Sequence, residues 1–209
     1  KTPLGALMMY QEIIESEPDN TNTGKEFSQK IGIALKRMEQ LILSMLKITR
    51  LDTGNILFDK RACSVQELIK NAISELTTRA TQEKKQLIVQ GTPNQTVICD
   101  MDWTSEAIGN LVKNALDHTE AGGIIRITWE STPTMLRILV SDNGSGIAPE
   151  DIHHIFKRFY RSKYSLNIPG IGLGLPLAKS IIEGQGGLIS VQSVLHEGTT
   201  FSVSFLTKS

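Results

Sequence analysis

Asn110 and Asn114 are the first residues whose type and spacing suit metal chemistry. They stand four residues apart in a segment predicted to be helical, so both side chains project from one face. Uncharged amide oxygens beside a phosphate can hold Mg²⁺ without adding negative charge, and magnesium usually keeps waters and uses phosphate oxygens as ligands. The alternative, two asparagines on a solvated face, is disfavoured by the apolar residues interleaved with them, Leu111, Ala115 and Leu116.

Asp142 is the second candidate, because it closes an apolar segment just before Gly144 and Gly146. A carboxylate only accepts hydrogen bonds, so it suits the exocyclic amine of adenine and rejects guanine, which has a carbonyl there. The glycines lack Cβ atoms where a ligand must approach the backbone. The alternative, a turn that merely joins two elements, would be favoured for these five residues alone. Because these residues stand in a fixed order with the other motifs, we favour a ligand site over a simple turn.

Residues 170–175 form the third motif, which carries Gly170, Gly172 and Gly174 and runs into a predicted helix. Free N–H groups at a helix start, together with the helix dipole, form an anion site. The motif is not a P-loop, because no Gly-Lys-Ser/Thr follows. It also does not follow a strand of a Rossmann unit.

The elements that must position these residues are short strands and helices without strict alternation. Helices are expected at residues 64–81, 102–118 and 173–183, and a short helix within 147–160. Ser64 and Glu67 form a capping box at the start of the first. Strands are expected at residues 86–90, 96–99, 123–130, 136–141, 187–194 and 200–206. This order predicts an α+β domain, a sheet covered on one face by helices.

The first part of the chain predicts a helical hairpin. Helices are expected at residues 2–17 and 25–51, separated by a turn at 18–24 and ended by Gly54. The apolar positions of the second helix alternate steps of four and three: Ile31, Leu35, Met38, Ile42 and Met45. Two helices cannot bury this stripe, so we expect a dimeric four-helix bundle. Packing of the stripe on the second domain is the less favoured alternative.

Composition limits the function classes. The 209 residues include 22 Lys+Arg and 22 Asp+Glu, so the neutral chain has no overall attraction to nucleic acid or an anionic membrane. Any phosphate site must therefore be local. Cys63 and Cys99 suit a reducing compartment and two ordinary buried thiols. No segment has the apolar length of a membrane helix, so we expect no membrane contact by this part of a longer protein.

In their order, the three motifs resemble the asparagine box and the two glycine boxes of the GHKL ATP-binding domain. Sensor histidine kinases, gyrase and heat-shock chaperone ATPases share this domain. Residues 1–5, KTPLG, resemble the stretch that follows the phosphoacceptor histidine of sensor kinases. This selects the histidine kinase branch and places the acceptor just upstream of Lys1.

The resemblance implies three regions: a dimerisation and phosphotransfer hairpin over residues 1–53, a linker over 54–63, and an ATP-binding domain over 64–209. The expected fold is a helical hairpin, forming a four-helix bundle on dimerisation, followed by a two-layer α+β sandwich of the GHKL (Bergerat) type.

The resemblance also implies roles for individual residues. Asn114 would bind Mg²⁺ directly, and Asn110 would support the phosphates. Related ATPases have a water-activating glutamate at position 110, and an asparagine cannot take a proton, which favours phosphoryl transfer over hydrolysis. Asp117 replaces a common lysine and is given no role, and His118 is either at the pocket edge or structural. The remaining expected ATP-binding residues are Asp142, Gly144, Gly146, Ile147, Phe159, Lys163, Gly170, Gly172, Leu173, Gly174, Leu175 and Thr200.

Residues 156–161, FKRFYR, resemble the phenylalanine box of the family. Phe156 and Phe159 would pack the base of a lid over residues 162–169, and Arg158 would touch the γ-phosphate. Arg161 and Lys163 would lie near this phosphate, and a solvated basic edge is the alternative for these two residues. Thr2 stands at the family's phosphatase position; a role only at the helix start is an equal alternative.

The implied function is that of the catalytic core of a sensor histidine kinase, in the cytoplasm, from a membrane-anchored parent. Mg-ATP would phosphorylate the hairpin His of the homodimer, and the phosphoryl group would pass to an aspartate of a response-regulator receiver domain. This chain by itself is not expected to autophosphorylate. The alternatives are a GHKL-type ATPase or protein serine kinase, and a non-catalytic docking module.

Overall fold

The computed structural model describes residues 3–16, 21–163 and 170–207. The chain divides into two compact units, Lys1–Lys47 and Ile48–Ser209. The predicted domain boundaries after residues 53 and 63 stay predictions. Within the described residues, no helix combines the length and the apolar character that a membrane span requires.

The N-terminal unit contains the two predicted helices. Helix α1 spans Pro3–Ser16 and α2 spans Thr21–Asp52, with the end of α2 belonging to the second unit. Tyr10 of α1 packs against Phe27 of α2 with ring centroids 5.6 Å apart. Helix α2 begins at Thr21, so the expectation of a turn through residue 24 was wrong for residues 21–24. The end matches the prediction: Gly54 adopts φ +67° and donates its N–H to the carbonyl of Leu51.

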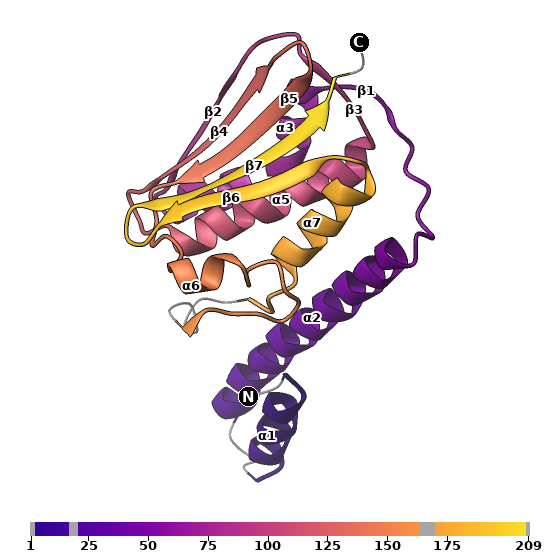
Figure 1. Ribbon diagram of the computed structural model, residues 1–209. Helices are drawn as coiled ribbons and strands as arrows, with labels where there is room; N and C mark the ends of the chain where they lie inside the picture. The colour runs from indigo at the N-terminus through magenta and orange to yellow at the C-terminus, as the bar shows by residue number, and fades with distance from the viewer. Residues whose placement is uncertain (1–2, 17–20, 164–169, 208–209) are drawn as a thin grey trace. The chain divides into compact units, whose positions relative to one another are not determined.

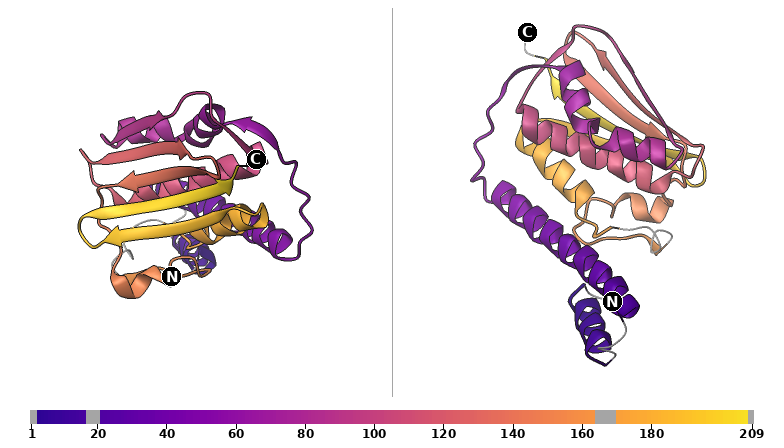
Figure 2. Two further views of the ribbon diagram at one scale, coloured as in Figure 1. Left: turned by 45° about the horizontal axis from the view of Figure 1, so that its top comes forward. Right: turned by 180° about the vertical axis from the view of Figure 1, so that it is seen from behind.

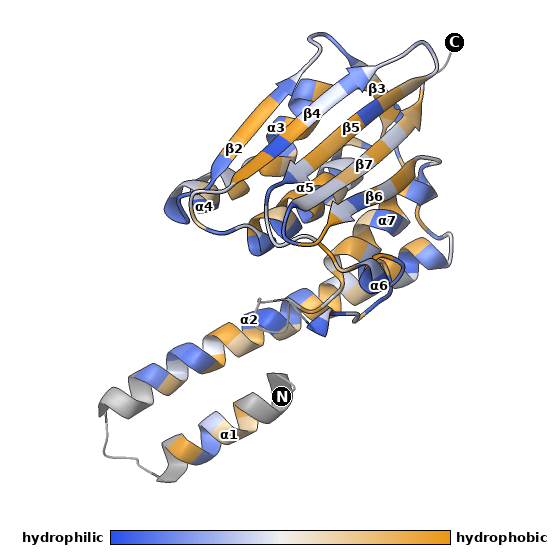
Figure 3. Cartoon of the chain, turned by 60° about the vertical axis from the view of Figure 1, so that its left-hand side comes forward, coloured by the Kyte–Doolittle hydropathy of each residue, from blue (hydrophilic) through white to orange (hydrophobic). Residues whose placement is uncertain are grey.

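Helix α2 carries two apolar sides. Ala34 and Ile48 are buried, whereas Leu35 and Ile42 of the predicted seam are each 54% exposed in the single chain. Figure 3 shows the hydrophobic segments of α2 recurring between hydrophilic ones along the helix. The exposed seam is therefore apolar surface that a second helix pair could cover.

The C-terminal unit is an α+β sandwich, as predicted. Its main sheet has the order β2-β4-β5-β7-β6, in which β2 pairs in parallel with β4 and the other pairs are antiparallel. The strands are β2 (Gln86–Gly91), β4 (Ile124–Ser131), β5 (Met135–Asp142), β6 (Leu188–Val194) and β7 (Gly198–Leu206). Figure 1 shows the sheet with its helices on one face, and the right-hand view of Figure 2 shows these helices from the other side.

The helices of this unit are α3 (Val65–Ile73), α4 (Leu76–Gln82), α5 (Met101–His118), α6 (Pro149–Ile152) and α7 (Gly174–Gly184). Half of the capping box predicted at the start of α3 is confirmed, since the Ser64 hydroxyl accepts the N–H of Glu67 at 3.5 Å. The single helix predicted over 64–81 was wrong. The helix ends at Ser74, whose N–H bonds to the carbonyl of Asn71, three residues back instead of four.

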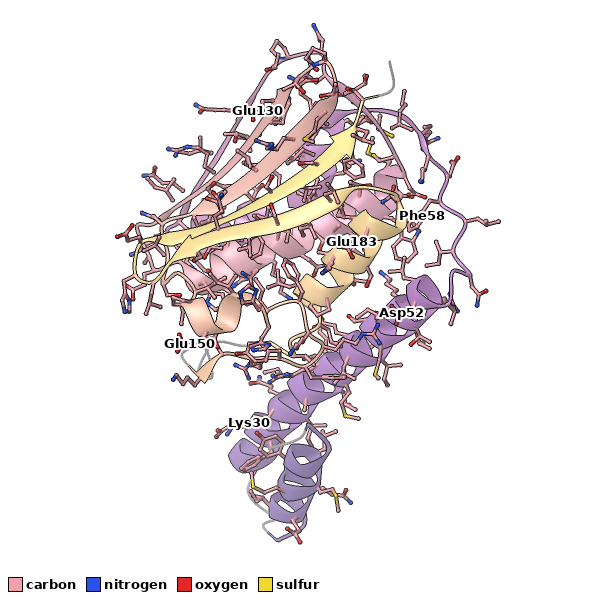
Figure 4. All side chains as sticks on the ribbon, viewed as in Figure 1. Lys30, Asp52, Phe58, Glu130, Glu150 and Glu183 are labelled. Atoms are coloured by element: carbon pink, nitrogen blue, oxygen red, sulfur yellow. The ribbon has the colours of Figure 1, made fainter. Side chains whose placement is uncertain are left out.

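A second, two-stranded sheet takes one of its strands from the region predicted to be linker, whereas its other strand matches a predicted one. Strand β1 (Arg61–Ser64) pairs antiparallel with β3 (Thr96–Cys99). Strand β1 was missed because its four residues do not alternate clearly between apolar and polar. Cys63 and Cys99 are free, buried thiols, as expected, and burial raises the pKa of Cys99 to about 12. Phe58, labelled in Figure 4, packs edge-on against Trp103 with centroids 6.1 Å apart.

The core lies between the main sheet and helices α5 and α7. Alternate residues of β4, β5 and β7 point inward, and the fully buried side chains include Ile125, Ile127, Leu136, Ile138 and Phe201. They meet the buried faces of the two helices, which carry Ile108, Leu111, Leu116, Ile181 and Ile182. This packing fixes which face of α5 turns away from the sheet.

We expect Leu111→Ala to destabilise the C-terminal unit by about 2–5 kcal/mol, because it leaves a cavity at a fully buried position. Trp103 and Trp129, the two tryptophans of the chain, both lie in this unit, so urea denaturation followed by fluorescence measures its free energy of unfolding. Leu188→Ala is the matched control, since Leu188 is 66% exposed. Equal losses in the two variants would contradict the described core.

Candidate functional site

The C-terminal unit contains a cavity of about 200 Å³ where α5, the turn after β5 and the start of α7 meet. Segments far apart in the sequence therefore converge on one site. Among the residues predicted from sequence, those that line it are Asn110, Asn114, His118, Gly146, Ile147, Gly170, Gly172, Gly174 and Leu175.

Helix α5 presents its polar face to this cavity because its apolar face is committed to the core. Asp100 starts the helix by accepting the N–H of Trp103 at 3.2 Å. The side-chain amide of Asn110 donates to the carbonyl of Glu106 at 3.0 Å, and its amide oxygen faces Gly174 in the first turn of α7. Asn114 follows one turn later on the same wall. Two neutral oxygen donors thus lie beside a helix N-terminus, an arrangement that suits Mg²⁺ held together with phosphate oxygens.

Asp142 ends β5 with a buried carboxylate that is only partly satisfied. Its Oδ1 accepts the N–H of Gly144 at 2.9 Å. Its Oδ2 is buried without a hydrogen-bond partner among the described residues. Burial raises the pKa of Asp142, and the backbone amides of Gly144 and Thr199 partly offset this rise. A buried acceptor without a donor is costly, so this oxygen suits a ligand that brings an N–H group.

Asp142 itself does not line the cavity, but its pairing partner Thr199 does. The hydroxyl of Thr199 lies 3.0 Å from that of Ser193, which in turn accepts the N–H of Ile147 at 2.8 Å. This short network fixes the wall next to the carboxylate.

The role expected of the glycines after Asp142 needs correction at Gly146. This residue adopts φ +66°, and a Cβ added there would lie 2.0 Å from the carbonyl oxygen of Val194. Glycine is therefore required at this position by the approach of the protein's own backbone. A ligand does not have to be invoked for it.

The start of α7 has the features of an anion site. Leu173 precedes the helix and provides no side-chain hydrogen bond to its first amides. Gly174 and Leu175 begin the helix and line the cavity. The unsatisfied N–H groups and the positive end of the helix dipole therefore face the same space as Asn110.

A backbone hydrogen bond joins two parts of the segment between α6 and α7. The N–H of Phe159 donates to the carbonyl of Gly172 at 2.9 Å, and both residues have positive φ values. The hydroxyl of Tyr160 donates to the carboxylate of Asp151 in α6. The first bond joins the two segments that flank the predicted lid, and the second ties the segment before the lid to α6. Residues 164–169 of that lid, and Thr2 at the predicted phosphatase position, lie outside the described residues.

Several predicted site residues stand away from the cavity. Arg158 pairs with Asp52 in the same unit. Lys163 pairs with Glu150 of α6 at 3.7 Å (Figure 4 labels Glu150). Phe159 is 50% exposed, whereas Phe156 packs edge-on against Phe201 at 6.4 Å. The other predicted residues outside the lining are Gly144, Leu173 and Thr200.

Arg161, expected either near the γ-phosphate or on a solvated basic edge, lines the cavity. The cavity is also lined by residues to which sequence reasoning gave no nucleotide role: Lys113, Asp117, Ser145, Ala148, Ile155, Tyr160, Ser162, Ile171, Pro176, Leu195 and Thr199. Helical spacing could have identified Lys113 and Asp117, which stand three and seven residues after Asn110. Burial lowers the pKa of His118; the nearby Asp117 carboxylate partly offsets this fall, and Arg161 adds to it.

Known proteins resemble this chain over nearly its whole length. The sensor-like histidine kinase SenX3 of Mycobacterium tuberculosis is 28% identical over 98% of this chain and 50% of its own length. The sensor protein SrrB of Staphylococcus aureus is 30% identical over 97% of this chain and 35% of its own length. The chain thus spans half or less of the length of these relatives.

The fold also matches a solved structure, the histidine kinase ThkA in complex with the response regulator protein TrrA. The TM-score is 0.81 at 22% identity, covering 99% of this chain and 58% of the other chain.

A family model, described as histidine kinase-, DNA gyrase B- and HSP90-like ATPase, matches residues 99–209. The match includes the α5 asparagines, Asp142 and the start of α7, all of which the structure brings to one end of the main sheet. The chain therefore belongs to the family of histidine kinase-, DNA gyrase B- and HSP90-like ATPases.

Proposed function

We propose that this chain is the ATP-binding catalytic core of a two-component sensor histidine kinase. The observation that carries the proposal is the convergence of Asn110, Asn114, the uncapped start of α7 and the segment after Asp142 on one cavity. SenX3, named a sensor-like histidine kinase, and SrrB, named a sensor protein, match across both units of the chain. The proposed parent is a longer, membrane-anchored protein whose catalytic part lies in the cytoplasm.

Different residues of the site bind the adenine, the phosphates and the Mg²⁺ of Mg-ATP. The unpaired Oδ2 of Asp142 accepts a hydrogen bond from the adenine amine, while Ile147 and Thr199 hold the wall beside it. The start of α7 binds phosphate oxygens through its free amides. Asn114 is a direct Mg²⁺ ligand and Asn110 supports the phosphates. Bound Mg²⁺ neutralises charge on the transferring group.

Phosphoryl transfer needs little from the protein beyond positioning and charge neutralisation. The bond between the γ-phosphorus and the β,γ-bridging oxygen breaks, a phosphorus–nitrogen bond forms on a histidine of the intact protein's hairpin, and ADP leaves. The phosphoryl group then passes to a receiver-domain aspartate. Asn110 cannot accept a proton, which favours this transfer over hydrolysis by activated water. To contact the γ-phosphate, Arg158 would have to leave its ion pair with Asp52. Thr2 would take part in dephosphorylating the response regulator.

The transfer is tested by mixing this chain with labelled Mg-ATP and a longer partner that keeps the hairpin His but carries Asp142→Asn. Label on the partner is the expected result. We expect Asn114→Asp in this chain to reduce that labelling at least about tenfold, since an added negative charge disturbs the metal and phosphates. Asn71→Asp, on the exposed side of α3, is the matched control.

Two outcomes would contradict the kinase assignment. One is rapid steady-state release of phosphate without labelled protein, which would favour an ATPase. The other is a wild-type chain that binds no ATP, which would favour a docking module.

We expect Asp142→Asn to weaken ATP binding by about 1–3 kcal/mol, because the amide can place a donor where the adenine amine needs an acceptor. Isothermal titration calorimetry with Mg-ATP measures the change. Asp102→Asn is the control, since Asp102 is exposed in the first turn of α5. Unchanged affinity in Asp142→Asn would refute the adenine role.

We also propose that α1 and α2 form a four-helix bundle in a homodimer, because Leu35 and Ile42 leave an apolar seam exposed. Ile42→Glu should give monomers in sedimentation velocity, as burial of the new charge would be unfavourable. Glu39→Gln, at an exposed polar position of α2, should leave the dimer intact. A persistent Ile42→Glu dimer would overturn the bundle.

A further inference from the structure

The wall of the cavity formed by α5 carries a positive and a negative side chain beside its two asparagines. Asn110, Lys113, Asn114 and Asp117 follow one another at steps of three, one and three, so they share one helix face, and all four line the cavity. Lys113 is exposed, whereas the side chain of Asp117 is only 15% exposed. A carboxylate in this position would repel the phosphates of a nucleotide unless a cation neutralised it.

That cation is Arg79, which reaches Asp117 from α4 and does not itself line the cavity. Its Nη2 lies 2.6 Å from Oδ1 of Asp117, and its Nε lies 2.6 Å from Oε1 of Glu83. Glu83 also pairs with Lys85, whose ammonium group donates to the carbonyl of Leu116 at 2.7 Å. Asp117 is thus held on the α4 side by a chain of alternating charges anchored at the end of α5.

This arrangement determines what Lys113 can do. A lysine and an aspartate four residues apart on a helix are neighbours and would ordinarily pair. Because Arg79 holds Asp117, Lys113 makes no ion pair within the part of the chain that the structure describes. Arg158 and Lys163, by contrast, are paired with Asp52 and Glu150. Lys113 is therefore a cation left available on the α5 wall of a chain with no net charge.

We infer that Lys113 is the α5 residue that contacts the polyphosphate of the nucleotide, and that Arg79 is a positioning residue that keeps Lys113 available by holding Asp117. The inference rests on the proposed function, in which this cavity binds ATP. It places the phosphate-binding cation one turn before Asp117 and makes the α4 ion pairs part of the nucleotide site.

The role of Lys113 is tested with Lys113→Gln and the matched control Lys70→Gln, which removes an exposed lysine of α3. We expect Lys113→Gln to weaken Mg-ATP binding by about ten- to a hundredfold, the range for a lost charged hydrogen bond, and to leave adenosine binding unchanged. Both affinities are measured by competition with a fluorescent ATP analogue. Unchanged ATP affinity, or equal loss for ATP and adenosine, would overturn the assignment.

The role of Arg79 is tested by rescue. In Arg79→Gln the freed carboxylate of Asp117 pairs with Lys113, so we expect ATP affinity to fall several-fold. Asp117→Asn should bind ATP at least as well as the wild type, and the double variant Arg79→Gln/Asp117→Asn should recover wild-type affinity. A double variant as weak as Arg79→Gln would show that Arg79 serves only stability, and thermal melting of each variant measures that effect separately.

The outcomes separate this inference from the proposed function. A wild-type chain that binds no Mg-ATP would refute the proposed function and this inference together. A wild-type chain that binds Mg-ATP while Lys113→Gln binds it equally well would refute only the role of Lys113.

Discussion

Packing of α5 against the main sheet is the interaction on which the rest of the C-terminal unit depends. Leu111 and Leu116 are fully buried on the sheet side, and their burial contributes several kcal/mol to stability. The helix cannot rotate without exposing them. Its opposite face, with Asn110 and Asn114, is consequently held toward the start of α7 and the turn after β5. The apolar core thus sets the positions of polar groups that make no contact with it.

Charge is organised locally in this protein, since the chain as a whole is neutral. Around the cavity, one carboxylate is neutralised by a cation from outside the cavity, and two cations line the cavity itself. Arg79 holds Asp117 from outside the cavity, while Lys113 and Arg161 line it. Asp142 shows the reverse arrangement, in which a carboxylate is buried with one oxygen lacking a partner. The unpaired oxygen of Asp142 is costly for folding, and a ligand that donates a hydrogen bond to it would offset that cost.

The differences between expectation and structure come from contacts that no local pattern records. The helix predicted over residues 64–81 is two helices, because the N–H of Ser74 bonds three residues back, to Asn71, instead of four. Strand β1 exists because β3 pairs with it, and four residues are too few to show a period. Arg158 was expected at the phosphates from its neighbours in the sequence, and its pairing with Asp52, 106 residues earlier, is a contact that this local pattern does not record.

The sequence alone determined the class of the protein: the strands of the main sheet, the α5 and α7 helices, and the candidate residues Asn110, Asn114, Asp142 and Gly174. These follow from periodicity, capping and motif order, which are properties of neighbouring residues. Tertiary structure alone decided which of them share a cavity, that Asp142 keeps an unpaired oxygen, and that Asp117 pairs with Arg79, 38 residues earlier. The physical reason is that charge pairing and burial depend on distances between segments, and these distances are set only when the helices pack on the sheet.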